Sequence, residues 1–255
     1  MKKYPLLLAL ALSLALLAAC GQRTGGGEPT AQPLPGEEVI TCRVVTMEEN
    51  ELLLAATEGR TSDVYILPLG EIPVTYEDPD QTALRPGDLV KIGYSGLVEE
   101  TFPARLGGAE ALQVQAQGRD NLCSLYLRVL SDLWEVDPGL NSDIIQLGLD
   151  LSQTRLTPAE QSAVAYVLWG ERKLEVLQNT WQELADQGYI DRETLQWTDG
   201  LFFSIVEDDP EAEKLTFTAQ KWRSGTGAYF FTDCTAQRAA DGSWGDYTVG
   251  AEAIS

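Results

Sequence analysis

Histidine is absent from this sequence, and its absence removes a large part of enzyme chemistry. Ser-His-Asp and Cys-His nucleophile pairs, histidine-containing zinc sites and imidazole general bases all need that side chain. The G-x-S-x-G elbow and the S-x-x-K motif of serine nucleophiles are missing as well. Paired carboxylates could still act as general acid and base, as in glycoside hydrolysis.

Basic residues are scarce. Lys and Arg number 18 against 39 Asp and Glu, and the formal net charge is −21. Because proteins bind phosphate-rich partners through Lys and Arg, this balance argues against nucleic acid as a partner. The acids are spread along the chain and 44% of the residues are hydrophobic, which is typical of a folded protein and not of a disordered acidic tail.

A hydrophobic run long enough to cross a bilayer is also missing. About 20 apolar residues are needed, and the longest run, Leu6 to Ala19, is shorter. Two lysines precede it, as in a secretory signal peptide. Its end, Leu17-Ala18-Ala19-Cys20, resembles the bacterial lipobox. The resemblance implies lipidation of Cys20 and an extracytoplasmic protein anchored to the outer face of the cell membrane. The alternative is an ordinary signal peptide that is cut near Ala19.

Residues 1–19 are thus expected to form a signal peptide and residues 20–36 a flexible linker behind the lipid anchor. Three consecutive glycines and three prolines, without apolar periodicity, are typical of a linker. Beyond the anchor, Cys42, Cys123 and Cys234 remain. A Cys123–Cys234 disulfide would stabilise the fold by about 4 to 5 kcal/mol in the chain-entropy model. The other interpretation is three buried free thiols, since cysteine is among the most buried residue types.

Residues 37–117 have the pattern of a small all-β barrel. The predicted strands are Val39–Val45, Leu52–Ala56, Val64–Leu69, Leu89–Tyr94 and Leu112–Ala116. One long connection, which contains Asp78-Pro79-Asp80, follows the third strand. Five strands with their long crossover in that place predict an OB-like barrel.

Two strings in this region carry a family resemblance. Leu84–Ile92 and Gly96–Ala104 resemble the pattern G-D-x-V-x-[IV] … G-x-[IV]-x-E-[ST]-[YF]-P-A. That pattern occurs in a small, uncharacterised β-barrel domain of many Gram-positive lipoproteins. The resemblance implies a fold and a compartment but no biochemical role, because a fold does not determine function.

Residues 118–255 are predicted to form an α+β domain in which helices pack on an antiparallel sheet. An apolar stripe from Leu122 to Trp134 predicts the first helix. Thr157-Pro158-Ala159-Glu160 is a capping box that starts the second, and a further helical stretch is expected from Leu174 to Gly188. Strands are expected at residues 201–206, 215–222 and 228–236 and near Tyr247. This half resembles the C-terminal halves of hypothetical clostridial lipoproteins.

Candidate ligand-binding residues come from the tryptophans, all six of which lie in the second domain. Exposed aromatic rings offer a large contact area at low entropic cost. The candidates are those near loops, with their polar neighbours: Trp222, Arg223, Tyr229, Asp233 and Trp244. The acidic run Glu207-Asp208-Asp209-Pro210-Glu211 lacks the spacing of a calcium loop and is interpreted as a solvated turn.

The sequence therefore predicts a lipid-anchored, acidic, extracytoplasmic α+β protein of two domains. Its expected role is a non-enzymatic binding or adaptor module for an envelope protein or small ligand, with no cofactor, no metal and no nucleic-acid partner. A carboxylate-dependent hydrolase of envelope polymers is the alternative, and a solute receptor is a weaker third.

Overall fold

The first part of the chain alternates apolar residues with tight turns and folds into strands. The computed structural model describes residues 33–209 and 214–255. Six strands come first: β1 (Glu38–Glu48), β2 (Glu51–Ala56), β3 (Val64–Pro68), β4 (Val74–Tyr76), β5 (Leu89–Glu99) and β6 (Ala104–Val114). The hydrogen-bonded order is β3-β2-β1-β5-β6, and a parallel β3–β6 pairing closes these five strands into a barrel. The short β4 pairs in parallel with the C-terminal end of β6, from Leu112 to Val114.

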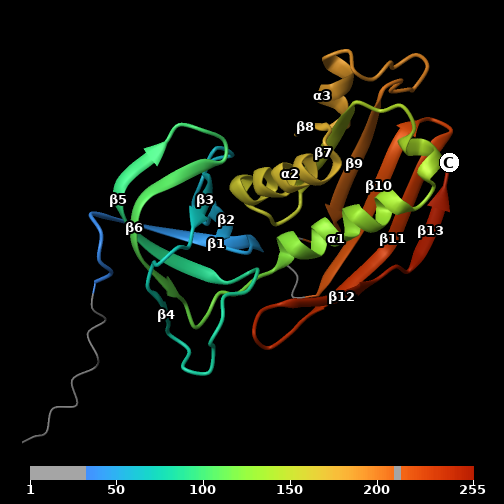
Figure 1. Ribbon diagram of the computed structural model, residues 1–255. Coiled ribbons are helices and arrows are strands. Elements are labelled where there is room, and N and C mark those ends of the chain that lie inside the picture. Colours follow the sequence, from blue (N-terminus) through green and yellow to red (C-terminus); the bar gives the residue numbers. More distant parts are fainter. Residues whose placement is uncertain (1–32, 210–213) are drawn as a thin grey trace, which may run out of the picture. The chain divides into compact units, whose positions relative to one another are not determined.

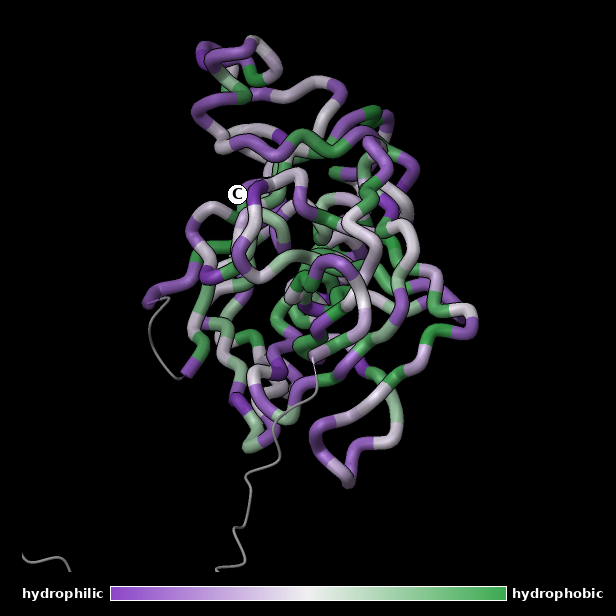
Figure 2. The backbone as a smooth tube through the Cα atoms, turned by 90° about the vertical axis from the view of Figure 1, so that its left-hand side faces the viewer, coloured by the Kyte–Doolittle hydropathy of each residue, from purple (hydrophilic) through white to green (hydrophobic). Residues whose placement is uncertain are grey.

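Inward-facing side chains fill the barrel, as expected for a five-stranded barrel of this size. Cys42, Leu54, Ile92 and Leu112 are fully buried there. Viewed toward the barrel, the hydrophobic segments gather at the centre and hydrophilic segments lie on the outer loops (Figure 2). The sequence prediction of five strands is confirmed, but β6 begins at Ala104, well before the predicted Leu112, and β4 was not predicted.

The second sheet contains β7 (Gln146–Gln153), β8 (Glu175–Leu177), β9 (Gly200–Glu207), β10 (Leu215–Ser224), β11 (Gly227–Arg238), β12 (Trp244–Thr248) and β13 (Ala251–Ile254). Its order is β12-β11-β10-β9-β7-β8, with β13 also paired to β11. The predicted antiparallel pairing is confirmed from β9 to β12, but β7 and β8 were not predicted as strands, and β7 runs parallel to both β8 and β9. The fold as a whole is mostly β and consists of a closed barrel and a second sheet.

The helices are α1 (Leu122–Glu135), α2 (Pro158–Arg172) and the short α3 (Trp181–Asp186), with a 3₁₀ turn at Pro138–Asn141. The predicted capping box of α2 is confirmed: Thr157 Oγ1 accepts from Glu160 N at 3.3 Å, and Glu160 Oε2 accepts from Thr157 N at 2.8 Å. The helix predicted from Leu174 to Gly188 is confirmed only over α3 and is wrong before it. Lys173 takes a left-handed conformation that ends α2, and the chain then pairs with β7 as β8 before Thr180 caps α3.

Both long helices lie over one face of the second sheet, and α2 also contacts the barrel (Figure 1). The main apolar core combines residues of α1, α2 and the sheet with Val45, Leu53 and Ala55 of the barrel's outer face. Leu34–Ser255 is accordingly one compact unit. Among the described residues, no helix is both long and apolar enough to cross a membrane.

Buried polar residues tie the elements together. Lys221 on β10 is fully buried, and its Nζ donates to the carbonyls of Trp134 at 3.3 Å and Asp137 at 3.2 Å, and to that of Val136. These carbonyls form the C-terminal end of α1, where a cation is favoured by the helix dipole. Burial lowers the pKa of Lys221 from 10.5 to about 8.

Candidate functional site

A hollow of about 440 Å³ lies between the β1–β2 hairpin and α2. Met47 and Leu53 from the barrel and Tyr166 and Gly170 from α2 are among its lining residues. Gly170 has no side chain to fill the space, and a Cβ there would meet no atom within 4 Å. The hollow therefore remains open where the barrel and α2 face each other.

A second hollow, of about 270 Å³, lies on the other side of Tyr166. It is lined by Phe102 from the β5–β6 connection, by Tyr166 and Trp169 from α2, and by Val176 from β8. Tyr166 lines both hollows, and we call the two hollows together the α2 groove. Both volumes are close to or within the range of small-ligand pockets, about 300 to 1,000 Å³.

Three aromatic rings form the middle of the α2 groove. The rings of Tyr166 and Trp169 stack with centroids 6.1 Å apart and an interplanar angle of 24°. Phe102 meets Tyr166 edge to face, at 6.3 Å and 87°. Each pair adopts a geometry that aromatic quadrupoles favour. The three rings thus pack against one another, while Phe102 and Trp169 also remain exposed to solvent.

Trp169 and Phe102 are mostly exposed, with 50% and 54% of their surface accessible. The buried side of α2 consists of small and branched residues, including Ala163, Val164 and Leu168, which pack in the main core. Trp169 follows Leu168 and points away from that core. Large apolar rings left in water beside a hollow are typical of binding surfaces and not of packing.

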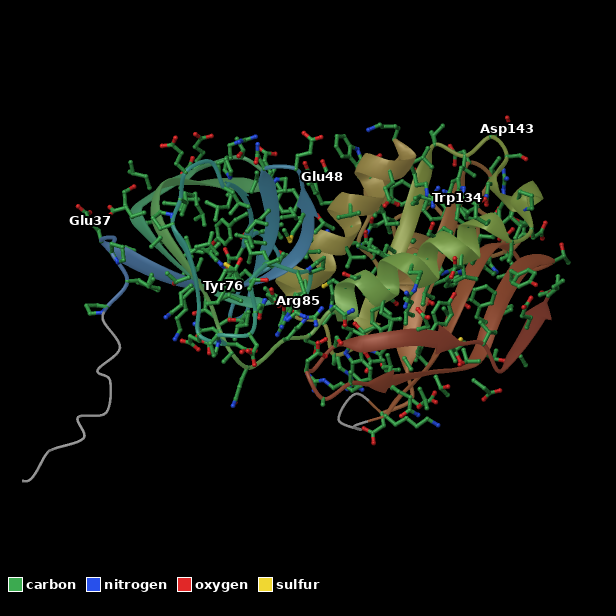
Figure 3. The ribbon with its side chains drawn as sticks, turned by 60° about the horizontal axis from the view of Figure 1, so that its bottom comes forward. Glu37, Glu48, Tyr76, Arg85, Trp134 and Asp143 are labelled. Carbon is green, nitrogen blue, oxygen red and sulfur yellow. The ribbon has the colours of Figure 1, made fainter. Side chains whose placement is uncertain are left out.

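Carboxylates surround the larger hollow. Glu48, Glu51 and Glu171 line it together with a single cation, Lys173. The side chain of Glu51 forms an ion pair with Arg105 at 3.4 Å. Among the described residues, the side chains of Glu48 and Glu171 have no hydrogen-bond or ion-pair partner. Figure 3 shows Glu48 beside α2, at the opposite end of the barrel from Glu37. The hollow is therefore negative as well as aromatic.

An ion pair holds the barrel against α2 at one end of the helix. Arg43 on β1 donates from Nε to Glu160 Oε1 at 2.8 Å, and the two side chains are 17% and 8% exposed. The Arg43 guanidinium also donates to the carbonyls of Gly87 at 3.1 Å and Gly118 at 2.7 Å. This pair and the shared apolar core fix the spacing of barrel and helix that leaves the groove open.

Two of the predicted ligand residues, Trp222 and Arg223, have structural partners. Trp222 packs edge to face on Trp181, at 5.7 Å. Arg223 donates to three backbone carbonyls, those of Leu140 at 3.0 Å, Ser142 at 2.5 Å and Thr198 at 2.7 Å. Arg223 thus joins the 3₁₀ turn and the start of β9 to β10.

Trp244 is only 3% exposed, and its Nε1 donates to Asp120 Oδ1 at 2.9 Å. Tyr229 donates its hydroxyl to Glu252. Asp233 is exposed at an irregularity of β11, where its φ is 51°. Trp222 pairs with the start of β11 and Trp244 with its end, so roughly 30 Å of strand separate them. The five predicted residues therefore do not lie together as one surface.

The sequence analysis missed Trp169, the one tryptophan of the six that is mostly exposed. It was not singled out, because it lies directly beside the apolar Leu168 on the predicted second helix. A helical projection of α2 gives the one available signal, because Trp169 falls on the side of Ser162 and Tyr166 and away from Val164 and Leu168.

The cysteines are buried free thiols, so the Cys123–Cys234 disulfide considered from the sequence is not formed. Burial raises the pKa of Cys42 and Cys234 to about 12 and raises that of Cys123 as well. All three behave as small apolar core residues. Cys20, the predicted lipidation site, lies outside the described residues.

Glu207, the first residue of the acidic run, is buried. Its carboxylate accepts from Tyr126 Oη at 2.6 Å and from Arg155 Nε at 2.6 Å. In the part of the chain that the structure describes, no three Cys, Asp or Glu side chains are grouped to hold a metal ion. The chain matches no protein family, no curated protein and no solved structure.

Proposed function

We propose that this protein is a non-enzymatic binding module of the cell envelope that holds its ligand in the α2 groove. The observation that supports this role most strongly is the exposed Trp169, stacked on Tyr166 beside an open hollow. The anchor is proposed to be a lipid on Cys20, with residues 1–19 removed as a signal peptide and residues 20–36 acting as the linker. The protein would then work on the outer face of the cell membrane, as a lipoprotein of the Gram-positive type that its motifs resemble.

We further propose that the barrel is OB-like and that residues 118–255 form an α+β domain that packs against it. The strand order β3-β2-β1-β5-β6 with a parallel closing pair supports the first point. Barrels of that type bind ligands on their second and third strands and on the loops after the first and fourth strands. The α2 groove includes residues of β2, β3, the β1–β2 hairpin and the β5–β6 connection, so it occupies that face.

Photo-crosslinking in living cells tests this proposal. A photoreactive amino acid replaces Trp169 in the full chain, and a control variant carries it at Ile254, which is 72% exposed on β13. We expect a discrete adduct from position 169 and none from position 254. Adducts of equal yield from both positions, or none from position 169, would contradict a ligand site in the α2 groove.

A further inference from the structure

We infer that the ligand of the α2 groove is a cationic peptide segment, one that presents lysine or arginine side chains to Trp169 in the smaller hollow and to the carboxylates of the larger one. This inference rests on the proposed function and adds the chemical class of the ligand. It is carried by three observations on the groove: its charge, its unpartnered tryptophan and the position of Glu171.

The negative charge of the groove favours a positively charged ligand. Glu48 and Glu171 line the larger hollow without a partner among the described residues, and Glu175 lines the smaller one, where it accepts from Gln146 at 2.7 Å. Lys173 is the single cation of the lining. Opposite charges attract, so these exposed carboxylates favour a cation over an anion or a neutral group. The overall charge of −21 also steers cations toward the protein.

Among the described residues, Trp169 lacks the cation that two of the other five tryptophans, Trp134 and Trp244, possess. Arg172 lies over the Trp134 ring at 4.8 Å, and two arginines lie over Trp244 at 5.6 Å each. No such cation lies over Trp169 among the described residues. A guanidinium or ammonium within about 6 Å of the ring is attracted by its quadrupole. A ligand cation would complete at Trp169 the arrangement that arginines already make at Trp134 and Trp244.

Glu171 occupies a position that does not suit the helix. It lies in the last turn of α2, where the helix dipole disfavours a carboxylate. It makes no ion pair with a described residue, so the stability of the fold does not explain its charge. A bound cation would neutralise this carboxylate at the helix end and offset the dipole at the same time.

The two hollows suit a segment with more than one side chain. Tyr166 lines both of them; Phe102 and Trp169 line the smaller hollow, and Glu48 and Glu171 line the larger one. Neighbouring side chains of an extended peptide can occupy both sides of Tyr166. A neutral sugar ring could also stack on Trp169, but it would gain nothing from Glu48 or Glu171.

Isothermal titration of the full chain with a capped hexalysine peptide and with neutral chitotetraose separates these ligands. The test variant is Glu48→Gln combined with Glu171→Gln, both at exposed positions. The matched control is Glu37→Gln, an exposed acid at the far end of the barrel (Figure 3). Trp169→Ala removes the ring.

We expect the peptide to bind and the double variant to weaken its binding by about 5- to 10-fold, as two partly exposed ion pairs allow. Trp169→Ala should weaken it about 3-fold or more, and Glu37→Gln should leave it unchanged. Added salt should weaken the binding as well.

Equal effects of the double variant and of Glu37→Gln would overturn the inference, because the peptide would then bind by general charge alone. Binding of chitotetraose that depends on Trp169 but not on the two glutamates would overturn the cationic class and keep the groove as a binding site. If neither probe binds in a way that depends on Trp169, the inference fails, and crosslinking at position 169 decides the proposed function separately.

Discussion

Replacing Glu160 by Gln tests whether the ion pair between the barrel and α2 contributes to the fold as its geometry indicates. The change removes the negative charge that faces Arg43 at 2.8 Å. It keeps an amide oxygen that can still accept from Thr157 N, and so it keeps the capping box at the start of α2. The perturbation therefore isolates the ion pair from the helix cap.

The magnitude follows from the burial of the pair. Removing one partner of a fully buried ion pair destabilises a protein by about 3 to 5 kcal/mol. Arg43 keeps its two carbonyl acceptors and is 17% exposed, so its charge is not left entirely without partners. We expect a loss of about 2 kcal/mol, within the range of about 1.5 to 3 kcal/mol for one hydrogen bond to a charged group.

Urea unfolding followed by tryptophan fluorescence gives the free energy of unfolding for this comparison. Glu183→Gln is the matched control, because Glu183 forms the same capping box with Thr180 at the start of α3, is exposed, and makes no ion pair with any residue that the structure describes. We expect the control to lose clearly less stability. Equal losses in the two variants would refute the structural role of the Arg43–Glu160 pair.

Three further predictions concern buried and modified groups. The pKa of Lys221 is lowered from 10.5 to about 8, so between these pH values the folded chain binds fewer protons at this side chain than the unfolded chain does. The contribution of Lys221 to stability therefore rises as pH increases from about 8 to 10.5. The urea midpoint of Lys221→Met should lack this rise, and equal pH profiles of the two proteins would contradict the prediction. Cys20→Ala should move the protein from the membrane fraction to the medium on cell fractionation, and retention on the membrane would oppose the lipid anchor. Ellman's reagent should leave Cys42, Cys123 and Cys234 unreacted in the native protein, because their thiols are buried and their pKa values are raised. After unfolding it should titrate all three thiols. A single reactive thiol among these three cysteines after unfolding would indicate a disulfide.

Local signals predicted the elements that depend on local chemistry. The apolar stripe of α1 and the Thr157 capping box are satisfied within a few residues, and both appear in the structure. The stretch after Lys173 was mistaken for helix because apolar residues three and four positions apart also occur where a short strand is followed by a new helix. Its pairing with β7 is a long-range contact that no local pattern encodes.

The binding surface was harder to predict than the fold. Trp222 and Trp244 were candidates because they stand near loops, but Trp181 packs on the first and Asp120 accepts from the second. Whether a ring is covered depends on elements far away in the sequence. Trp169 is exposed because the barrel and α2 meet around Tyr166 and leave the groove open, and that meeting involves segments about 100 residues apart.

Fluorine NMR of protein labelled with 5-fluorotryptophan tests most directly that the α2 groove is the ligand site. The six tryptophans give separate resonances, and a Trp169→Phe variant assigns the one that matters. On addition of the hexalysine peptide, and of a detergent extract of the cell envelope, we expect the Trp169 resonance to shift while those of the buried Trp197 and Trp244 stay in place. A shift at Trp222 or Trp244 with none at Trp169 would place the ligand elsewhere and contradict the account.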